Sequence, residues 1–185
     1  MNRIFCLETE WDQSLHDLKK TSSVKSLLDF LTTCNNVQYC FRQVATLDDF
    51  EYYLKHLEHP SYDNYDMVYL CYHGTAGKIG FANREHMDIM NLIKYDRIFE
   101  DKNVHFDSCS TLNMDEDDIR ALKRGTKARL ISGYTKNVPF LESFLFELWL
   151  LNTISRHPSY RAMQIRNLAE KQMPFYVKKL GFVIY

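Results

Sequence analysis

Two apolar stretches of this chain end in side chains that can do chemistry. Residues 65–74 read YDMVYLCYHG, and residues 104–109 read VHFDSC. A nearly continuous apolar run such as 65–72 is typical of a central strand that is covered on both faces of a sheet. The second run is shorter but has the same character. Each is therefore predicted to be a buried strand, the first stopping at His73 and Gly74 and the second at Asp107, Ser108 and Cys109.

The rest of the chain alternates between strand-like and helix-like segments. Further strands are expected at 2–7, 37–44, 128–134 and 182–185. Helices are expected at 22–33, 46–56, 84–97, 113–123, 138–156 and 158–171, with Thr46 as a cap, Gly125 ending the fourth and Pro158 in the first turn of the last. This order predicts an α/β three-layer sandwich: a mainly parallel sheet of about six strands with helices on both faces.

Length and charge bound the possible partners. The 185 residues fit one domain, over 1–185, and the 23 basic and 24 acidic residues give a formal net charge of −1. No basic stripe is evident, so nucleic acid is not expected as a partner. The most apolar stretch, 140–151, is interrupted by Glu142 and Glu147, so no membrane span is expected either.

Five cysteines, at positions 6, 34, 40, 71 and 109, form no metal-ligand spacing. Their odd number predicts reduced thiols in the cytoplasm, one of which can be a nucleophile. No metal or cofactor is expected. The segment 74–80 (GTAGKIG) contains glycines but fails the spacing of a phosphate-binding loop, because no Ser or Thr follows Lys78.

His73 and Cys109 have the chemistry of a catalytic pair. A free thiol is only a few per cent ionised at neutral pH, so a nucleophilic cysteine needs an imidazole as base or as the partner of an ion pair. Neighbouring parallel strands lie about 5 Å apart, so residues just beyond their carboxyl ends can meet. The backbone N–H groups of Gly74 and Cys109 can then donate to a developing oxyanion. Asp107, two residues before the thiol, is expected to point to the same side, toward the substrate cleft.

The HG that follows one buried strand and the DSCS at 107–110 resemble the signature of the caspase-like (clan CD) cysteine peptidases. The closest resemblance is to bacterial CHAT domains, metacaspases and clostripain-like enzymes, and the segment 128–151 resembles the strand and aromatic helix that follow the cysteine in CHAT domains. The resemblance implies a caspase-hemoglobinase fold, with His73 as general base or imidazolium and Cys109 as nucleophile. It also implies that Gly74 supplies an oxyanion-hole amide, and that Asp107 lines the S1 pocket and favours Arg or Lys at P1. A protein or peptide would be the substrate.

Two other interpretations stay open. Ser110 and Thr111 replace the His-Ser-Gly that follows the cysteine in metacaspases, which allows a catalytically silent caspase-like module that binds a regulatory protein partner. A flavodoxin-like or nucleotide-binding α/β domain with accidental HG and DSC motifs is the third. His105 is expected to pack on a sheet face, and the aromatic residues Phe140, Phe144 and Trp149 are expected in the core.

Overall fold

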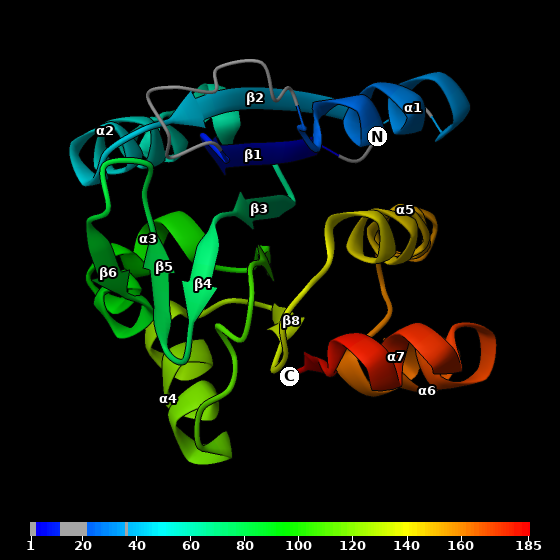
Figure 1. Cartoon of the computed structure of the whole chain (residues 1–185). Helices are drawn as coiled ribbons and strands as arrows, with labels where there is room; N and C mark the ends of the chain where they lie inside the picture. The colour runs from blue at the N-terminus through cyan, green and yellow to red at the C-terminus, as the bar shows by residue number, and fades with distance from the viewer. Residues whose placement is uncertain (1–2, 12–21, 36) are drawn as a thin grey trace.

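The computed structural model describes residues 3–11, 22–35 and 37–185, and its centre is a six-stranded sheet (Figure 1). The strand order is β2-β1-β3-β7-β8-β9, in which all neighbours are parallel except β9, which runs antiparallel to β8. The strands are β1 (Arg3–Thr9), β2 (Gln38–Val44), β3 (Met67–Cys71), β7 (Asn103–Asp107), β8 (Leu130–Tyr134) and β9 (Phe182–Ile184). The expected strands are confirmed, apart from residue 2, which lies outside the described residues.

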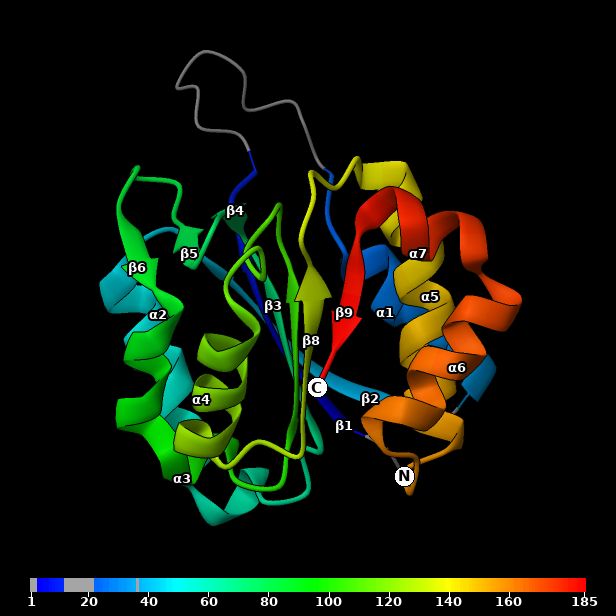
Figure 2. The ribbon, with the colours of Figure 1, turned by 90° about the horizontal axis from the view of Figure 1, so that it is seen from below.

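Helices cover both faces of this sheet, which makes the α/β three-layer sandwich that the sequence predicts (Figure 2). One layer holds α1 (Lys25–Asn35), α5 (Phe140–Arg156), α6 (Ala162–Gln172) and α7 (Pro174–Leu180). The other holds α2 (Leu47–Lys55), α3 (Asp96–Phe99), α4 (Glu116–Thr126) and a small antiparallel sheet of β4 (His73–Thr75), β5 (Lys78–Gly80) and β6 (His86–Asp88). Short 3-10 helices η1 (His56–Glu58), η2 (Pro60–Tyr62) and η3 (Ile89–Tyr95) connect these elements.

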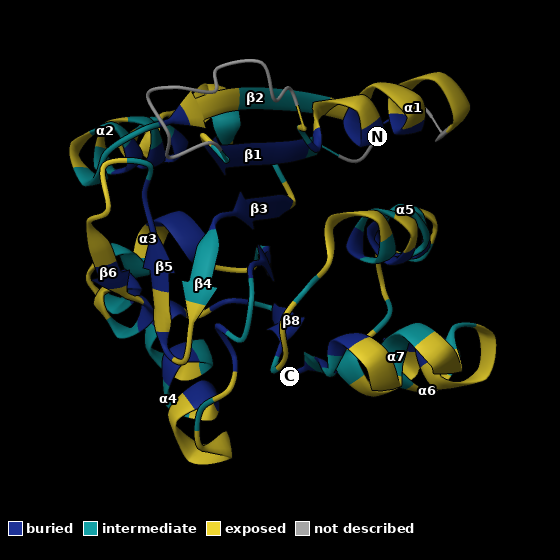
Figure 3. Ribbon diagram, in the orientation of Figure 1, coloured by how far each residue is buried: buried dark blue, intermediate teal, exposed yellow. Residues whose placement is uncertain are grey.

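The sheet separates two hydrophobic cores, and the alternation of side chains along β1 shows how. Phe5 and Leu7 belong to the core under α2 and α4, whereas Ile4 and Cys6 belong to the core under α1 and α5. The central strands β1 and β3 are therefore buried on both faces (Figure 3). Within the described part of the chain, no helix has the length and apolar character to cross a membrane.

Three expected helix boundaries are wrong. The segment 84–97 is not one helix, because β6 pairs with β5 and Asp88 then caps η3 by accepting a hydrogen bond from the Met90 N–H at 2.8 Å. Gly125 lies inside α4, whose C-cap is Lys127 with φ 56°; a Cβ on Gly125 would lie 2.8 Å from Ile93 Cδ1, so glycine permits close packing on η3. Pro158 precedes the helix α6, which begins only after Arg161.

Candidate active site

Cys109 sits in a loop that begins where β7 ends. Ser110 adopts a left-handed backbone, with φ 54°, which turns the chain immediately after the cysteine. The loop is tied to the segment after β8, because the Ser110 N–H donates to Lys136 O at 2.8 Å. The Val138 N–H donates to Cys109 Sγ at 3.3 Å. These contacts hold the sulfur at the carboxyl edge of the sheet.

His73 reaches the same place from the neighbouring strand. β3 and β7 are parallel neighbours with Cys71 opposite Asp107, and the chain leaves β3 directly into β4, which starts at His73. His73 and Cys109 both line one cavity of about 90 Å³. Placement of His73 and Cys109 after strands that are not neighbours would have favoured an accidental pair of motifs. Instead, β3 and β7 are adjacent. Asp107, Trp11, Phe140 and Ser143 line the cavity with them.

Gly74 allows β4 to pack directly on the cysteine loop. A Cβ at position 74 would lie 2.3 Å from Cys109 O, 2.4 Å from Thr111 Oγ1 and 2.9 Å from Cys109 N. Two of these are backbone atoms and cannot move aside without shifting the loop. Thr111 Oγ1 is itself fixed, since Ser108 Oγ donates to it at 2.7 Å and it donates to Lys78 O at 3.2 Å. Gly74 therefore lies against the backbone of Cys109.

We expect Gly74→Ala to reduce thiol-dependent turnover by about 100-fold, because displacing the Cys109 loop by about 1 Å costs a factor of this size. Thr75→Ala, on the exposed next residue of β4, is the matched control and should change turnover less than about twofold, or about 0.4 kcal/mol. Peptide hydrolysis and thermal unfolding of both variants measure the effect. Equal activity in the two variants would contradict the close packing of Gly74 on Cys109.

The environment of His73 disfavours the protonated imidazole. The ring is half-buried, its Nε2 is buried with no hydrogen-bond partner among the described residues, and the Trp11 ring lies edge-on with centroids 5.4 Å apart. Burial lowers the pKa of His73, a backbone group of Trp11 opposes this, and His86 adds to the lowering. A neutral imidazole with a free nitrogen is the form that can accept a proton.

Trp11 is itself held by a buried carboxylate, Glu8, near the end of β1. Glu8 accepts hydrogen bonds from Trp11 Nε1 at 2.7 Å, from Ser23 Oγ at 2.5 Å and from the Val24 N–H at 2.8 Å. Burial raises the pKa of Glu8. The sequence pattern did not single out either residue. The available signal was position, since Glu8 stands near the carboxyl end of a central strand, as Asp107 does.

The carboxyl group of Asp107 forms the acidic wall of the cavity. Its side chain is buried, and Tyr69 Oη donates to Asp107 Oδ2 at 2.9 Å. Desolvation, followed by the nearby carboxylate of Glu147, raises the pKa of Asp107 well above its ordinary value. Asp107 and Cys109 line the same cavity, which agrees with the expectation that their side chains point to the same side.

Behind Asp107 lies a buried polar network, of which the sequence indicates only His105. This residue packs on the sheet face as expected, with Nε2 2.6 Å from Glu147 Oε1 and Nδ1 2.8 Å from Ser132 Oγ. Tyr134 Oη donates to the same Glu147 oxygen. His105 and Glu147 are fully buried.

Phe140 corrects the expectation of an aromatic core stripe. Its side chain is 42% exposed and lines the cavity at the start of α5, whereas Phe144 and Trp149 are partly buried and pack against the core. Phe140 is therefore placed to contact a ligand of this cavity.

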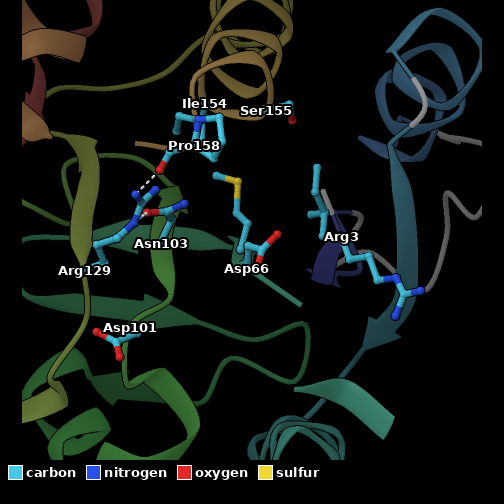
Figure 4. Close-up of a pocket in the computed structure, with 10 residues that line it drawn as sticks. Arg3, Asp66, Asp101, Asn103, Arg129, Ile154, Ser155 and Pro158 are labelled. Atoms are coloured by element: carbon cyan, nitrogen blue, oxygen red, sulfur yellow. Dashed lines mark hydrogen bonds between the residues drawn. The ribbon is translucent and has the colours of Figure 1, made fainter. Parts of the chain in front are cut away.

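A second cavity, of about 250 Å³, lies at the opposite, amino edge of the sheet (Figure 4). Arg3, Asp66, Asp101 and Arg129 give it mixed charge, and Arg129 is held by Asn103 Oδ1 at 3.0 Å and by Pro158 O. Among the described residues, no cysteine or histidine lines it. The chemistry expected from the sequence therefore belongs to the smaller cavity at the carboxyl edge.

The fold and this cavity define an α/β protein with a thiol and an imidazole at adjoining strand ends. The chain belongs to the family described as "Family of unknown function (DUF6642)", whose model matches residues 1–185. No curated protein matches it.

Among solved structures the chain is similar to caspase-1 from Spodoptera frugiperda, with 16% identity, 89% of this chain and 71% of that chain covered, and a TM-score of 0.49. It is similar to a structure of pro-sf-caspase-1 at 13% identity, covering 97% and 82%, also with a TM-score of 0.49. A carbon-sulfur lyase involved in aluminum resistance from Clostridium novyi NT has 18% identity, covers 72% and 29%, and gives a TM-score of 0.36.

Proposed function

We propose that this protein is a caspase-like cysteine endopeptidase that cleaves protein substrates after Arg or Lys. The observation that carries the proposal is that His73, Cys109 and Asp107 line one cavity at the carboxyl edge of the sheet. Ligands of open α/β sheets bind at this edge, beyond the carboxyl ends of the strands. Asp107 stands two residues before Cys109, which is the feature in which the sequence resembles metacaspases and clostripain-like enzymes.

The proposed reaction has two halves. His73 takes the thiol proton, Cys109 Sγ bonds to the scissile carbonyl carbon, and the carbon–nitrogen bond breaks as His73 returns the proton to the leaving amine. Water then attacks the thioester, giving up a proton to His73, and the carboxylic acid leaves as the thiol is restored. The N–H groups of Gly74 and Cys109 would donate to the oxyanion in both halves. The Val138 N–H donates to Sγ and so holds the sulfur in place for the first step.

Asp107 would select the residue before the scissile bond. An Arg or Lys side chain entering beside Phe140 and Ser143 would meet the Asp107 carboxyl, and an ionised carboxylate pairs strongly with a cation where water is excluded. Tyr69 holds one carboxyl oxygen in place. The other oxygen is the one available for the substrate.

A panel of fluorogenic peptides that differ only in P1 tests the proposal. The protein should hydrolyse the Arg and Lys peptides at least about 100-fold faster than the Leu and Asp peptides, since an unpaired buried carboxyl disfavours neutral and acidic side chains. Prior alkylation with iodoacetamide should abolish all turnover. Absence of turnover on a protein with an accessible, alkylatable Cys109 would sink the peptidase proposal and favour a binding module.

The preference for a basic P1 should increase with pH. Burial and the Glu147 carboxylate raise the pKa of Asp107, so its carboxyl ionises at higher pH than an ordinary aspartate does, and its pairing with Arg strengthens as pH rises. The ratio of kcat/KM for the Arg peptide to that for the Leu peptide should therefore still grow at pH values above the ordinary aspartate range, where an unshifted carboxyl would give a flat ratio. The lowered pKa of His73 affects both peptides equally and cancels in the ratio. In Asp107→Asn the ratio should be small and flat; a parent-like slope in that variant would contradict the assignment.

All five cysteines are free, and none of them is disulfide-bonded. Free thiols persist in a reducing compartment, so we place the proposed activity in the cytoplasm.

A further inference from the structure

Cationic side chains gather around two hollows at the end of α4, which, among the described residues, share no lining residue with the proposed active site. The first hollow has a volume of about 440 Å³ and is lined by Arg120, Lys123, Arg124, Lys127, Ala128 and Tyr185. The second, of about 370 Å³, includes Lys123, Arg129, Tyr160 and Arg161. Lys123 lines both, and no Asp or Glu of the described chain lines either. In a chain whose charges balance, such a local excess of cations over acidic side chains lining the hollows attracts anions.

The expectation of no basic stripe is wrong. Arg120, Lys123 and Arg124 are spaced i, i+3 and i+4 in α4, which places them on one helix face. Lys127 follows as the C-cap, with φ 56°, and extends the cluster beyond the helix end. Cations near a helix C-terminus also offset the helix dipole, which is reason enough for some of them. That reason does not extend to Arg129 and Arg161, which come from the approach to β8 and from the turn before α6.

Two of the cations have no partner that would neutralise them. Arg120 pairs with Glu116 at 2.7 Å and Lys127 with Asp96 at 2.8 Å. Lys123 and Arg124 have no side-chain hydrogen bond or ion pair within residues 3–11, 22–35 and 37–185. Partial burial lowers the pKa of Lys123, so an anion placed beside it would regain part of that desolvation cost.

Tyr185 gives the first hollow an aromatic wall. Its ring centroid lies 6.0 Å from the guanidinium carbon of Arg120 on α4 and 5.9 Å from that of Arg166 on α6. Figure 2 shows the C-terminus between these two helices, which cover opposite faces of the sheet. The residue is fixed by backbone hydrogen bonds in both directions with Ile131, at 2.9 and 3.2 Å. Aromatic rings and guanidinium planes are the surfaces on which heterocycles stack.

We propose that the first hollow binds a nucleoside polyphosphate, with the phosphates on Lys123 and Arg124 and the base against Tyr185 and Arg120. Its volume is that of a small-ligand site, the unpaired cations match a ligand with several negative charges, and the aromatic wall matches a ring. The site is independent of the peptidase proposal. It also differs from the glycine segment 74–80, which lies beside Cys109 rather than beside α4.

Binding of fluorescently labelled ATP to the full chain, followed by anisotropy, tests this inference, with thermal unfolding to confirm that each variant is folded. The paired variant Lys123→Gln/Arg124→Gln should weaken binding at least about tenfold, whereas Lys55→Gln/Lys171→Gln, which removes two exposed cations elsewhere, should change it less than about twofold. Tyr185→Leu should weaken ATP but not tripolyphosphate. Binding should also weaken as salt increases.

Three results would overturn the inference. One is no saturable ATP binding at millimolar concentration. The second is equal loss in the two paired variants. The third is affinity for a single-stranded oligonucleotide that grows with length and far exceeds that for ATP, which would assign the surface to a polynucleotide instead.

Discussion

Replacing Cys109 by alanine is expected to lower kcat/KM for an Arg-P1 peptide at least about 1,000-fold, because the variant has no nucleophile to form the acyl-enzyme. His73→Ala should have a loss of similar size, since no base would remain to accept the thiol proton. The two residues act as a unit, so the double variant should be no worse than either single variant. Initial rates on the same fluorogenic peptide at saturating and subsaturating concentrations measure this.

The fold should survive the removal of the thiol. Cys109 is only partly buried, and the main interaction that alanine cannot make is the Val138 N–H bond to sulfur, worth about 1 kcal/mol. Cys40→Ala, at another partly buried cysteine on β2, is the matched control and should keep parental activity. If Cys109→Ala hydrolyses the peptide as fast as Cys40→Ala does, the peptidase proposal fails, whatever the folded state of the two proteins.

The candidate site residues His73 and Cys109 could be predicted from the sequence because they follow two central strands of the sheet. Strands buried on both faces are mostly apolar, so β3 stands out, and β7 remains recognisable although His105 interrupts it. His73 and Cys109 stand out because they follow these two strands. Parallel neighbours then bring those ends together. Local pattern and global topology agree here, which is why the shared cavity could be anticipated.

The features that could not be predicted from the sequence depend on contacts between segments that are distant along the chain. Trp11 lies against His73 while its Nε1 donates to Glu8, a carboxylate that Ser23 and Val24 hold in place, and no spacing in the sequence encodes these contacts. Residues 86–88 were expected in a helix, but they pair with β5 as β6, and this small sheet is placed by Gly74 lying against the cysteine loop. The spacing of the cations on α4 is visible in the sequence. The proposed ligand site also needs Tyr185, the last residue of the chain, which packs against Arg120 only in the folded structure.

The largest expected change in stability is at Glu147, which lies behind the acidic wall of the cavity. Its Oε1 is the acceptor shared by His105 and Tyr134, and its Oε2 is buried with no hydrogen-bond partner among the described residues. Glu147→Ala should lower the free energy of unfolding by about 3–5 kcal/mol, because it leaves two fully buried donors unsatisfied and opens a cavity. Urea unfolding followed by circular dichroism measures this, and Tm should fall by about 10 °C.

Matched variants distinguish the loss of the buried hydrogen-bond network from the loss of a charge on α5. Glu142→Gln, earlier on the same helix, breaks only a surface pair with Lys179 and should cost less than about 1 kcal/mol. Glu147→Gln keeps an acceptor oxygen and should fall between the two. Removing both partners, as in His105→Phe/Glu147→Leu, should recover part of the loss, since apolar replacement of a whole buried pair leaves fewer polar atoms unsatisfied. A Glu147→Ala protein as stable as Glu142→Gln would show that His105 and Tyr134 find other acceptors. The role of Glu147 would then be to raise the pKa of Asp107 rather than to stabilise the sheet.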